Sequence, residues 1–227
     1  MDIVEAVNQR KSIRAFKPDA VPQEILREIM ELALRAPSWA NTQPWEFAIA
    51  GGKKLEEIKR GFAERALEQP ATDIPRTSEF PEPYDTRRSA LATRMLEIKG
   101  IDREDTEKRD RAKLQGLQLF GAPSAIYILV GRSFYFQGDG LNVWPLYDCG
   151  SVAQNIMLLA TKYGLGTIPQ AQAVWHPGIL RKVLEIPDSK LIVVGISIGY
   201  PDWDAPVNQF RSAREPLDKV AKWYGFD

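Results

Sequence analysis

The sequence is poor in the side chains that bind metals or form nucleophile–base pairs. Its 227 residues include one cysteine, Cys149, and one histidine, His176. A zinc-type site needs three or four such ligands, so most metal chemistry based on imidazole and thiolate is excluded, as is an internal disulfide. His176 precedes Pro177, a pattern typical of a helix start, which favours a structural or capping role over catalysis. Catalytic reactivity is therefore expected to come from a bound cofactor.

The sequence also lacks net charge and long hydrophobic runs. Thirty Lys and Arg side chains balance thirty Asp and Glu side chains, so no overall field attracts nucleic acid or an anionic membrane. No apolar run reaches the roughly 20 residues that cross a bilayer, and residues 1–5 carry charge instead of an apolar signal core. Together with the single cysteine, these features predict a soluble cytoplasmic protein without nucleic-acid or membrane partners.

Glycine-rich phosphate loops are absent too, which disfavours a Rossmann fold. Apolar runs predict strands over residues 45–50, 125–130 and 190–199, and the run at 125–130 is typical of a central strand buried on both faces. A further extended piece is expected over 167–173. Apolar residues or charge pairs at helical spacing predict a short helix before residue 10 and helices over 22–36, 53–69, 86–99, 104–119, 148–163 and 179–184.

This pattern predicts an α+β fold in which one mixed or antiparallel sheet is wrapped by helices. We expect a single domain over residues 1–227. Residues 70–83 carry four prolines, so the segment 70–120 is expected to be partly irregular and partly helical, and to lie near the site. The helix at 148–163 is apolar nearly all round, which indicates a core or a subunit interface. The tail at 200–227 is too apolar to be a free tail.

A basic cluster follows the first predicted helix: Arg10, Lys11, Ser12, Ile13 and Arg14. Arginine offers a planar fork that matches phosphate oxygens, lysine adds a point charge, and a serine hydroxyl can donate to a third oxygen. In an extended segment, the two arginines and the serine would point to one side. Cations are also common in the last turn of a helix, where they favour the negative end of its dipole. The five residues alone leave a phosphate site and an ordinary helix end both open.

A second unusual segment lies between the predicted helix at 22–36 and the predicted strand at 45–50. It combines two prolines, two indoles and four hydrogen-bonding side chains in the sequence Pro-Ser-Trp-Ala-Asn-Thr-Gln-Pro-Trp, residues 37–45. One interpretation is a rigid, capped turn whose tryptophans pack on the core. The other is a platform for a flat heteroaromatic ligand, in which Ser38 and Asn41 satisfy a polar edge and Trp39 covers a face.

Together, the two segments resemble the motifs of the FMN-dependent nitroreductase family. The resemblance continues through residues 121–123, 164–170, 199–201 and 211–214, so it covers almost the whole chain. Within the family, the segment 70–120 and the pair Pro169-Gln170 are most similar to the nitrobenzoate-reductase-like branch. The resemblance implies the nitroreductase-like α+β fold and a homodimer with FMN at the subunit interface.

The resemblance also implies roles for individual residues. The FMN phosphate and ribityl chain would be held by Arg10, Ser12 and Arg14, with Lys11 contributing backbone. Pro37, Ser38 and Trp39 would reach across from the partner subunit, and Asn41 would lie close to the site. Backbone amides of the stretch Pro169-Gln170-Ala171-Gln172 would approach the reactive edge of the flavin, and Arg211 and Arg214 would close over the phosphate. Trp39 replaces a small residue of many relatives, so its ring is expected to narrow or wall the substrate cavity.

The implied function is an FMN-dependent NAD(P)H oxidoreductase. NADH or NADPH would reduce the flavin and leave, and a nitroaromatic, quinone or activated alkene would then be reduced in ping-pong order. Reductive dehalogenation, oxidative breakdown of the flavin and flavin binding without turnover are the alternatives. The sequence does not distinguish NADH from NADPH.

Overall fold

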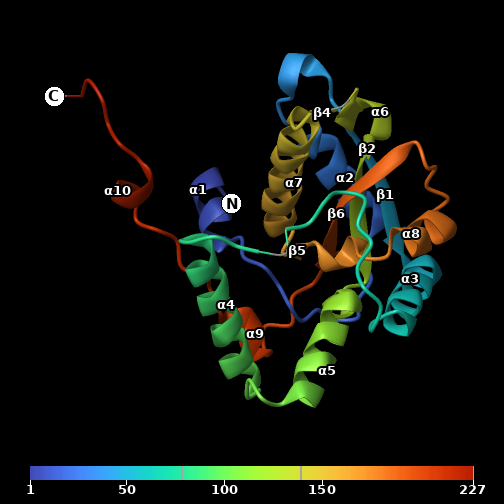
Figure 1. Ribbon diagram of the computed structural model, residues 1–227, viewed down its shortest axis with the longest axis vertical. Helices are drawn as coiled ribbons and strands as arrows, with labels where there is room; N and C mark the ends of the chain where they lie inside the picture. Colours follow the sequence, from blue (N-terminus) through green and yellow to red (C-terminus); the bar gives the residue numbers. More distant parts are fainter. Residues whose placement is uncertain (78, 139, 227) are drawn as a thin grey trace.

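The computed structural model describes residues 1–77, 79–138 and 140–226 and is built on a four-stranded antiparallel sheet (Figure 1). The strands follow the order β1 (Trp45–Gly51), β2 (Ser124–Gly131), β6 (Lys190–Gly199) and β5 (Gly166–Gln170). The predicted strands are confirmed, although β5 ends before residue 173. The α+β prediction is also confirmed, and of the two sheet types that were left open the antiparallel one is correct.

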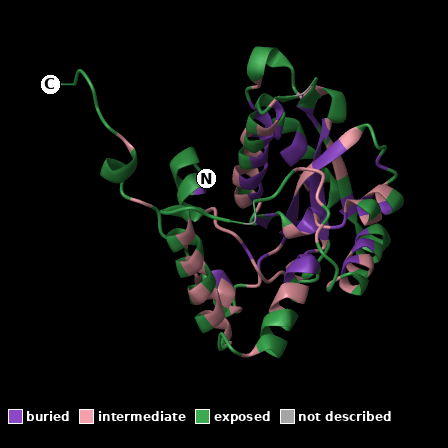
Figure 2. Ribbon diagram, in the orientation of Figure 1, coloured by how far each residue is buried: buried purple, intermediate pink, exposed green. Residues whose placement is uncertain are grey.

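Helices cover both faces of this sheet. One core packs α2 (Gln23–Ala33) and α7 (Trp144–Lys162) against one face. The other packs α3 (Gly52–Glu64) and α8 (Pro177–Leu184) against the opposite face. The sequence of strand β2 is apolar throughout because both of its faces are buried. Ile126 and Ile128 enter the first core, while Tyr127 and Leu129 enter the second. The purple, buried elements at the centre of Figure 2 are the central strands and the helix faces that they contact.

Several predicted boundaries differ from the structure. Helix α7 begins at Trp144, before residue 148, because Pro145 occupies its first turn and Val143 is its N-cap. Helix α3 ends at Glu64, and the chain continues in turns up to residue 68. Residues 131–146 contain elements that were not predicted, the short helix α6 (Arg132–Tyr135) and the hairpin of β3 (Phe136–Gln137) and β4 (Gly140–Leu141).

In the segment 70–120, a helical hairpin projects from the sheet and is preceded by irregular chain. The hairpin consists of α4 (Tyr84–Lys99), which has no buried residue, and α5 (Thr106–Leu117) (Figure 1). The described part of the irregular chain is anchored by Asp73, which accepts hydrogen bonds from Arg181 at 2.7 Å and from the Ile192 backbone at 2.8 Å. This ion pair fixes the irregular segment to β6 and α8.

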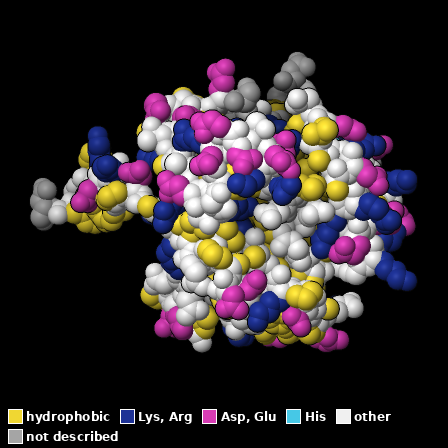
Figure 3. All heavy atoms as spheres, turned by 90° about the horizontal axis from the view of Figure 1, so that it is seen from below, with side chains coloured by type: hydrophobic (Ala, Val, Ile, Leu, Met, Phe, Trp, Pro, Cys, Tyr) yellow, Lys and Arg dark blue, Asp and Glu magenta, His cyan; other side chains and the backbone are white. Residues whose placement is uncertain are grey.

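The two ends of the chain lie outside the two cores. Helix α1 (Ile3–Gln9) buries only Ala6. After α9 (Pro206–Gln209), the tail carries α10 (Leu217–Val220) and stands away from the body (Figures 1 and 3). The expectation that the whole tail packs is therefore wrong for this single chain: Trp223 and Tyr224 are 65% and 78% exposed. Asp227 lies outside the described residues.

Within the described residues, no helix has the length and apolarity needed to cross a membrane. The same residues contain no cluster of three or more His, Cys, Asp or Glu side chains suited to a metal ion.

Candidate functional site

The basic cluster lies along the free edge of β5. Ser12 pairs with Thr167 in a parallel bridge, and the Ile13 backbone donates to the Thr167 carbonyl at 3.0 Å. Ile13 is buried beneath the segment, so its polar neighbours stay half-exposed. The close approach of the basic cluster to β5 requires a glycine at position 166, because a Cβ there would lie 2.4 Å from Ile13 Cγ1. The cluster is thus extended chain fixed to the sheet, and not the last turn of a helix.

Asn208 fixes the C-terminal end of this cluster. Its fully buried side chain accepts a hydrogen bond from the Arg14 backbone at 2.7 Å. It also donates to the carbonyls of Ala15 and Asp202, each at 2.7 Å. The sequence analysis missed this residue, because nothing near position 208 indicates contact with residues almost two hundred positions earlier.

The cations of the cluster meet those of the C-terminal segment. Burial, followed by repulsion from Arg214 and Arg211, lowers the pKa of Arg10. Burial and the charge of Arg211 likewise lower the pKa of Lys11. Arg211 donates to the Asn8 carbonyl, which holds it beside the end of α1. The structure therefore brings together four cations that the sequence analysis selected, and their mutual repulsion favours a bound anion.

A cavity of about 530 Å³ opens at this cluster. Its wall includes Arg10, Lys11, Arg211, Thr167 and Trp203. The Lys11 ammonium lies 5.0 Å from the centroid of the Trp203 ring, which holds the charge at the rim. The cavity thus offers both cations and an aromatic surface.

The end of β5 presents backbone more than side chains. Pro169 and Ala171 are exposed. The buried Gln170 side chain accepts from Ser197 Oγ at 2.5 Å and donates to the Gly116 carbonyl at 3.1 Å, so it joins β5 to β6 and α5. The Gln170 amide side chain is therefore structural, and the polar groups of 169–171 left for a ligand are those of the main chain.

The segment 37–45 forms a strained loop at the beginning of α7. Its 3-10 turn η1 (Trp39–Asn41) contains Ala40 and Asn41 at φ 48° and 57°, and Gln43 has φ 44°. Such conformations are costly for residues other than glycine and are found where the surroundings enforce them. Ser38 Oγ accepts from the Gln43 backbone at 3.0 Å, which agrees with the capped-turn interpretation.

Asp148 holds this loop against α7. Its buried carboxylate accepts from the Trp39 backbone, with both oxygens at 3.1 Å. The Trp39 ring is 52% exposed and stacks on Trp144, at 6.5 Å between centroids. The main chain is therefore fixed while the indole faces outward. The sequence analysis placed Asp148 at a helix start but gave it no role.

One subunit does not bring this loop to the basic cluster. The loop contacts α7 at Asp148, whereas the cavity beside Arg10 includes Thr161. From Asp148 to Thr161, helix α7 rises by about 20 Å. The two predicted halves of the site therefore lie near opposite ends of one helix.

His176 and Cys149 belong to the cores. The His176 ring packs on Phe62, with centroids 5.9 Å apart, and burial lowers its pKa. Its side chain makes no capping hydrogen bond to α8, so the structural interpretation is supported without the capping role. Burial, and then the charge of Asp148, raises the pKa of Cys149 to about 12, which keeps the thiol protonated.

Comparisons with known proteins agree with this architecture. A family model described as the nitroreductase family matches residues 7–200. The chain is 30% identical to nitroreductase NfnB of Mycolicibacterium smegmatis, covering 98% of this chain and 94% of that protein. It is also 30% identical to 4-nitrobenzoate reductase of Pseudomonas putida, covering 100% and 97%. The crystal structure of the FMN and NADPH-dependent nitroreductase NfnB from sphigopyxis sp. strain HMH superimposes with a TM-score of 0.92, at 29% identity over 100% of both chains.

Proposed function

Since the chain belongs to the nitroreductase family, we propose that it is an FMN-dependent oxidoreductase that uses NADH or NADPH to reduce a small electron-poor acceptor. Nitroaromatics, quinones and activated alkenes are the candidate acceptors. When bound, FMN would supply the redox chemistry, accepting a hydride from the nicotinamide and passing electrons to the acceptor in ping-pong order. The observation that carries the proposal is the group of cations fixed along the edge of β5.

The residues fit the phosphate end of FMN. Arg10, Arg211 and Arg214 come from two ends of the chain, and the pKa of Arg10 is lowered by the other two. A phosphate placed among them would replace this repulsion by charge-assisted hydrogen bonds. Ser12 and Lys11 lie in the same extended segment and would supply a hydroxyl and a further charge.

Two groups of the chain fit the isoalloxazine ring of FMN. The guanidinium of Arg14 lies at the other end of the basic segment, where burial lowers its pKa, so an anionic partner would stabilise the charged form. A cation there would favour negative charge on the pyrimidine edge of the ring. The exposed end of β5 at Ala171 would offer a main-chain N–H, held in place by the hydrogen bonds of the preceding Gln170.

A homodimer would join the two halves of the site. Two subunits related by a two-fold axis, with their α7 helices antiparallel, would bring Pro37, Ser38 and Trp39 of one to the basic segment of the other. The free surface of each subunit supports this arrangement. Trp144 and Tyr147 are 49% and 68% exposed at the beginning of α7.

The exposed apolar residues at the two ends of the chain also favour a second copy. On α1, Ile3 and Val4 are 66% and 65% exposed. On the tail, Leu217, Val220 and Phe226 are 60%, 64% and 77% exposed. Covering such a surface against an identical subunit would remove it from water, which is favourable at roughly 25 cal/mol per Å². The proposed dimer would be seen as twice the chain mass by sedimentation.

The proposal is tested by purification and photometry. The protein should be yellow, with an FMN spectrum that bleaches anaerobically when NADH or NADPH is added. It should then turn over a nitroarene at steady state. Colourless protein that cannot be reconstituted with FMN would contradict the proposal, and bleaching without turnover would favour flavin binding alone.

The phosphate assignment has its own test. Arg10→Ala should raise the FMN dissociation constant about tenfold or more, because it removes a charge-assisted contact worth roughly 1.5 to 3 kcal/mol. The matched control is Arg94→Ala, because Arg94 is an exposed residue of α4 that pairs with Glu97 at 2.8 Å. Equal FMN affinity in the two variants, measured by flavin fluorescence, would show that the assignment is wrong.

A further inference from the structure

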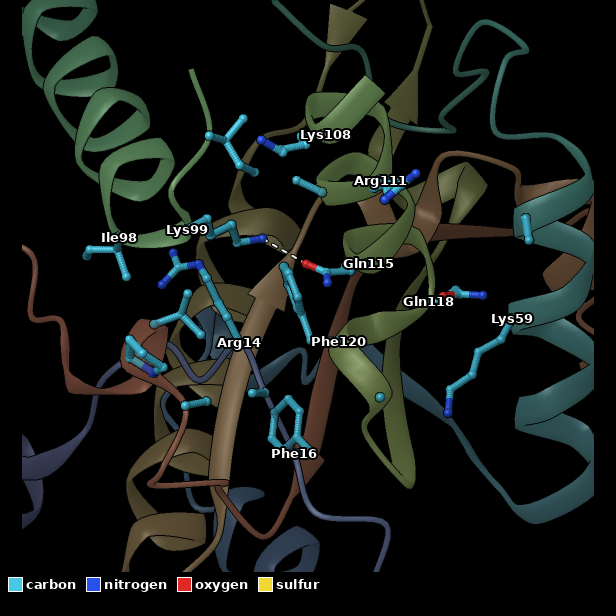
Figure 4. A pocket seen from close by; sticks show the side chains of 18 of the residues that line it. Arg14, Phe16, Lys59, Ile98, Lys99, Lys108, Arg111, Gln115, Gln118 and Phe120 are labelled. Carbon is cyan, nitrogen blue, oxygen red and sulfur yellow. Dashed lines mark hydrogen bonds between the residues drawn. The ribbon is translucent and has the colours of Figure 1, made fainter. Parts of the chain in front are cut away.

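A second and larger cavity, of about 1100 Å³, lies below the sheet beside the α4–α5 hairpin. The hairpin, α3, α9 and the chain at 14–16 enclose it (Figure 4). Its wall is strongly basic. The cations that line it are Arg14, Lys59, Arg60, Lys99, Lys108 and Arg111, against the single carboxylate of Glu56.

Several of these cations are neutralised by neighbours on their own helix. Lys59 pairs with Glu56 at 2.9 Å, Lys108 pairs with Asp105 at 3.0 Å, and Arg111 pairs with a glutamate one turn earlier. Pairs of this kind at helical spacing are ordinary surface features. They explain much of the positive charge of the cavity without a ligand.

Arg14 and Lys99 differ from these pairs. Within the described residues, neither forms an ion pair with a carboxylate. The Lys99 ammonium donates to Gln115 Oε1 at 2.9 Å, and the Arg14 guanidinium donates to the Ser12 carbonyl at 3.3 Å. Figure 4 shows both side chains turned toward the same space between α4 and α5. Arg14 and Lys99 are therefore partly buried cations that share one cavity with neutral partners, whereas Arg60, which also has no ion pair among the described residues, is exposed on α3.

Electrostatics give this pair a preference for an anion. Burial lowers the pKa of Arg14, and burial followed by repulsion from Arg14 lowers the pKa of Lys99. Two like charges held near one another in a partly buried space destabilise each other. A carboxylate bound at Lys99 would offset this repulsion and add a charge-assisted hydrogen bond.

The rest of the wall fits an aromatic body. The Lys99 ammonium lies 6.0 Å from the centroid of the Phe120 ring, and Ile98 and Ile101 also line the cavity. Phe120 is held there by a left-handed turn, with φ 56° at Leu119 and 55° at Phe120. Such a turn costs energy in residues other than glycine, and here it directs a ring into the cavity.

We propose that Lys99, which shares this cavity with the flavin-edge cation Arg14, binds the carboxylate of an aromatic acceptor and so selects anionic over neutral acceptors. This assignment rests on the proposed function and names its substrate class. Arg14 ends the basic segment that begins at Arg10, so the cavity adjoins the proposed flavin site. One aromatic ring and two isoleucines near Arg14 and Lys99 suit a compact carboxylated ring better than the long, highly charged phosphate chain of a nicotinamide coenzyme.

The test compares Lys99→Met with Lys108→Met in the FMN-loaded protein. The Lys108 variant removes a charge from the same cavity, but from a residue that is already paired with Asp105. The first measurement is calorimetric binding of benzoate, which needs no turnover. The second is kcat/KM for 4-nitrobenzoate divided by that for the neutral 4-nitrobenzamide.

We expect Lys99→Met to weaken benzoate binding about tenfold or more and to lower the ratio by a similar factor, while Lys108→Met changes neither by more than twofold. Lys99→Arg should retain most of the benzoate affinity and most of the kcat/KM ratio. Three results would overturn the assignment: equal effects of the two methionine variants, no effect of either, or a loss confined to the KM of NADPH, which would assign the cations to a coenzyme phosphate. FMN content is measured in every sample, so failure of the proposed function is recognised separately.

Discussion

Asn208 offers a sharp test of how the basic segment is held. Its side chain makes three hydrogen bonds of 2.7 Å, one accepted from the Arg14 backbone and two donated to the carbonyls of Ala15 and Asp202. Asn208→Ala removes all three and leaves three main-chain groups without their partner. Each such group costs about 1 to 3 kcal/mol when water does not replace the bond. Because the segment is partly buried, we expect a loss of about 3 to 5 kcal/mol in the free energy of unfolding.

Asn208→Asp separates hydrogen bonding from packing. The aspartate has nearly the same shape and can still accept from the Arg14 backbone. At neutral pH, however, its second oxygen would face the carbonyls of Ala15 and Asp202 without a proton to donate. We therefore expect Asn208→Asp to destabilise the protein at least as much as Asn208→Ala, although it preserves the volume of the side chain.

Urea unfolding at a fixed protein concentration gives the stability, and flavin fluorescence gives the FMN dissociation constant. The control is Asn155→Ala, whose half-buried side chain makes one hydrogen bond, to the Ala33 carbonyl at 3.2 Å, and should cost about 1 kcal/mol. Both Asn208 variants should also bind FMN at least tenfold more weakly, because the Arg14 main chain loses its anchor. A loss equal to that of Asn155→Ala would refute the reasoning.

Three further predictions concern the edge of β5, the strained loop and a buried thiol. Gly166→Ala should weaken FMN binding and lower the Tm, because its Cβ would lie 2.4 Å from Ile13, whereas Gly178→Ala, which meets nothing within 4 Å, should leave both unchanged. Trp39→Ala should change kcat/KM for bulky acceptors relative to small ones while FMN stays bound, and an unchanged ratio would count against a cavity wall at this position. Burial raises the pKa of Cys149 from 9.0 to about 12, so the unfolded chain loses the proton first. The contribution of this thiol to the free energy of unfolding is fully present below pH 9 and decreases as the pH rises toward 12. At pH 10 it is lower by about 1.4 kcal/mol. Urea unfolding of Cys149→Ala should show a shallower decline between pH 9 and 10, and equal slopes would contradict the assignment.

Local sequence was enough to predict most of the secondary structure. The strands over 45–50, 125–130 and 190–199 were recognisable as apolar runs of strand length, and the run at 125–130 is buried on both faces as predicted, whereas β1 is partly exposed. Strand partners were not predictable in the same way. The antiparallel order β1-β2-β6-β5 joins segments that lie far apart in the chain.

The candidate site likewise has parts that local sequence indicates and parts that only the fold reveals. Residue type and spacing singled out the cations at positions 10–14 and the loop at 37–45, and the family resemblance supplied their predicted roles. Asn208 was missed, since a single asparagine in a polar stretch looks like any turn residue. Lys99 was missed for a related reason: within its own helix it is one charge among many, and only the fold places it opposite Arg14.

The tail shows that amino-acid composition alone does not predict where apolar residues pack. Its apolar residues predicted a packed tail, and covering by a second subunit stays a proposal. In the single chain the apolar surface of the tail remains exposed, at 65% for Trp223.

The sequence by itself determined the chemical character of this protein: a neutral chain with few metal ligands, two uncommon segments and a family whose motifs they match. The tertiary structure decided how these parts are arranged. It fixed the basic segment to β5 through Ile13 and Asn208, and it placed the strained loop near the other end of α7. The physical reason is that side-chain chemistry is local, whereas the hydrogen bonds that position it connect residues as much as 203 positions apart.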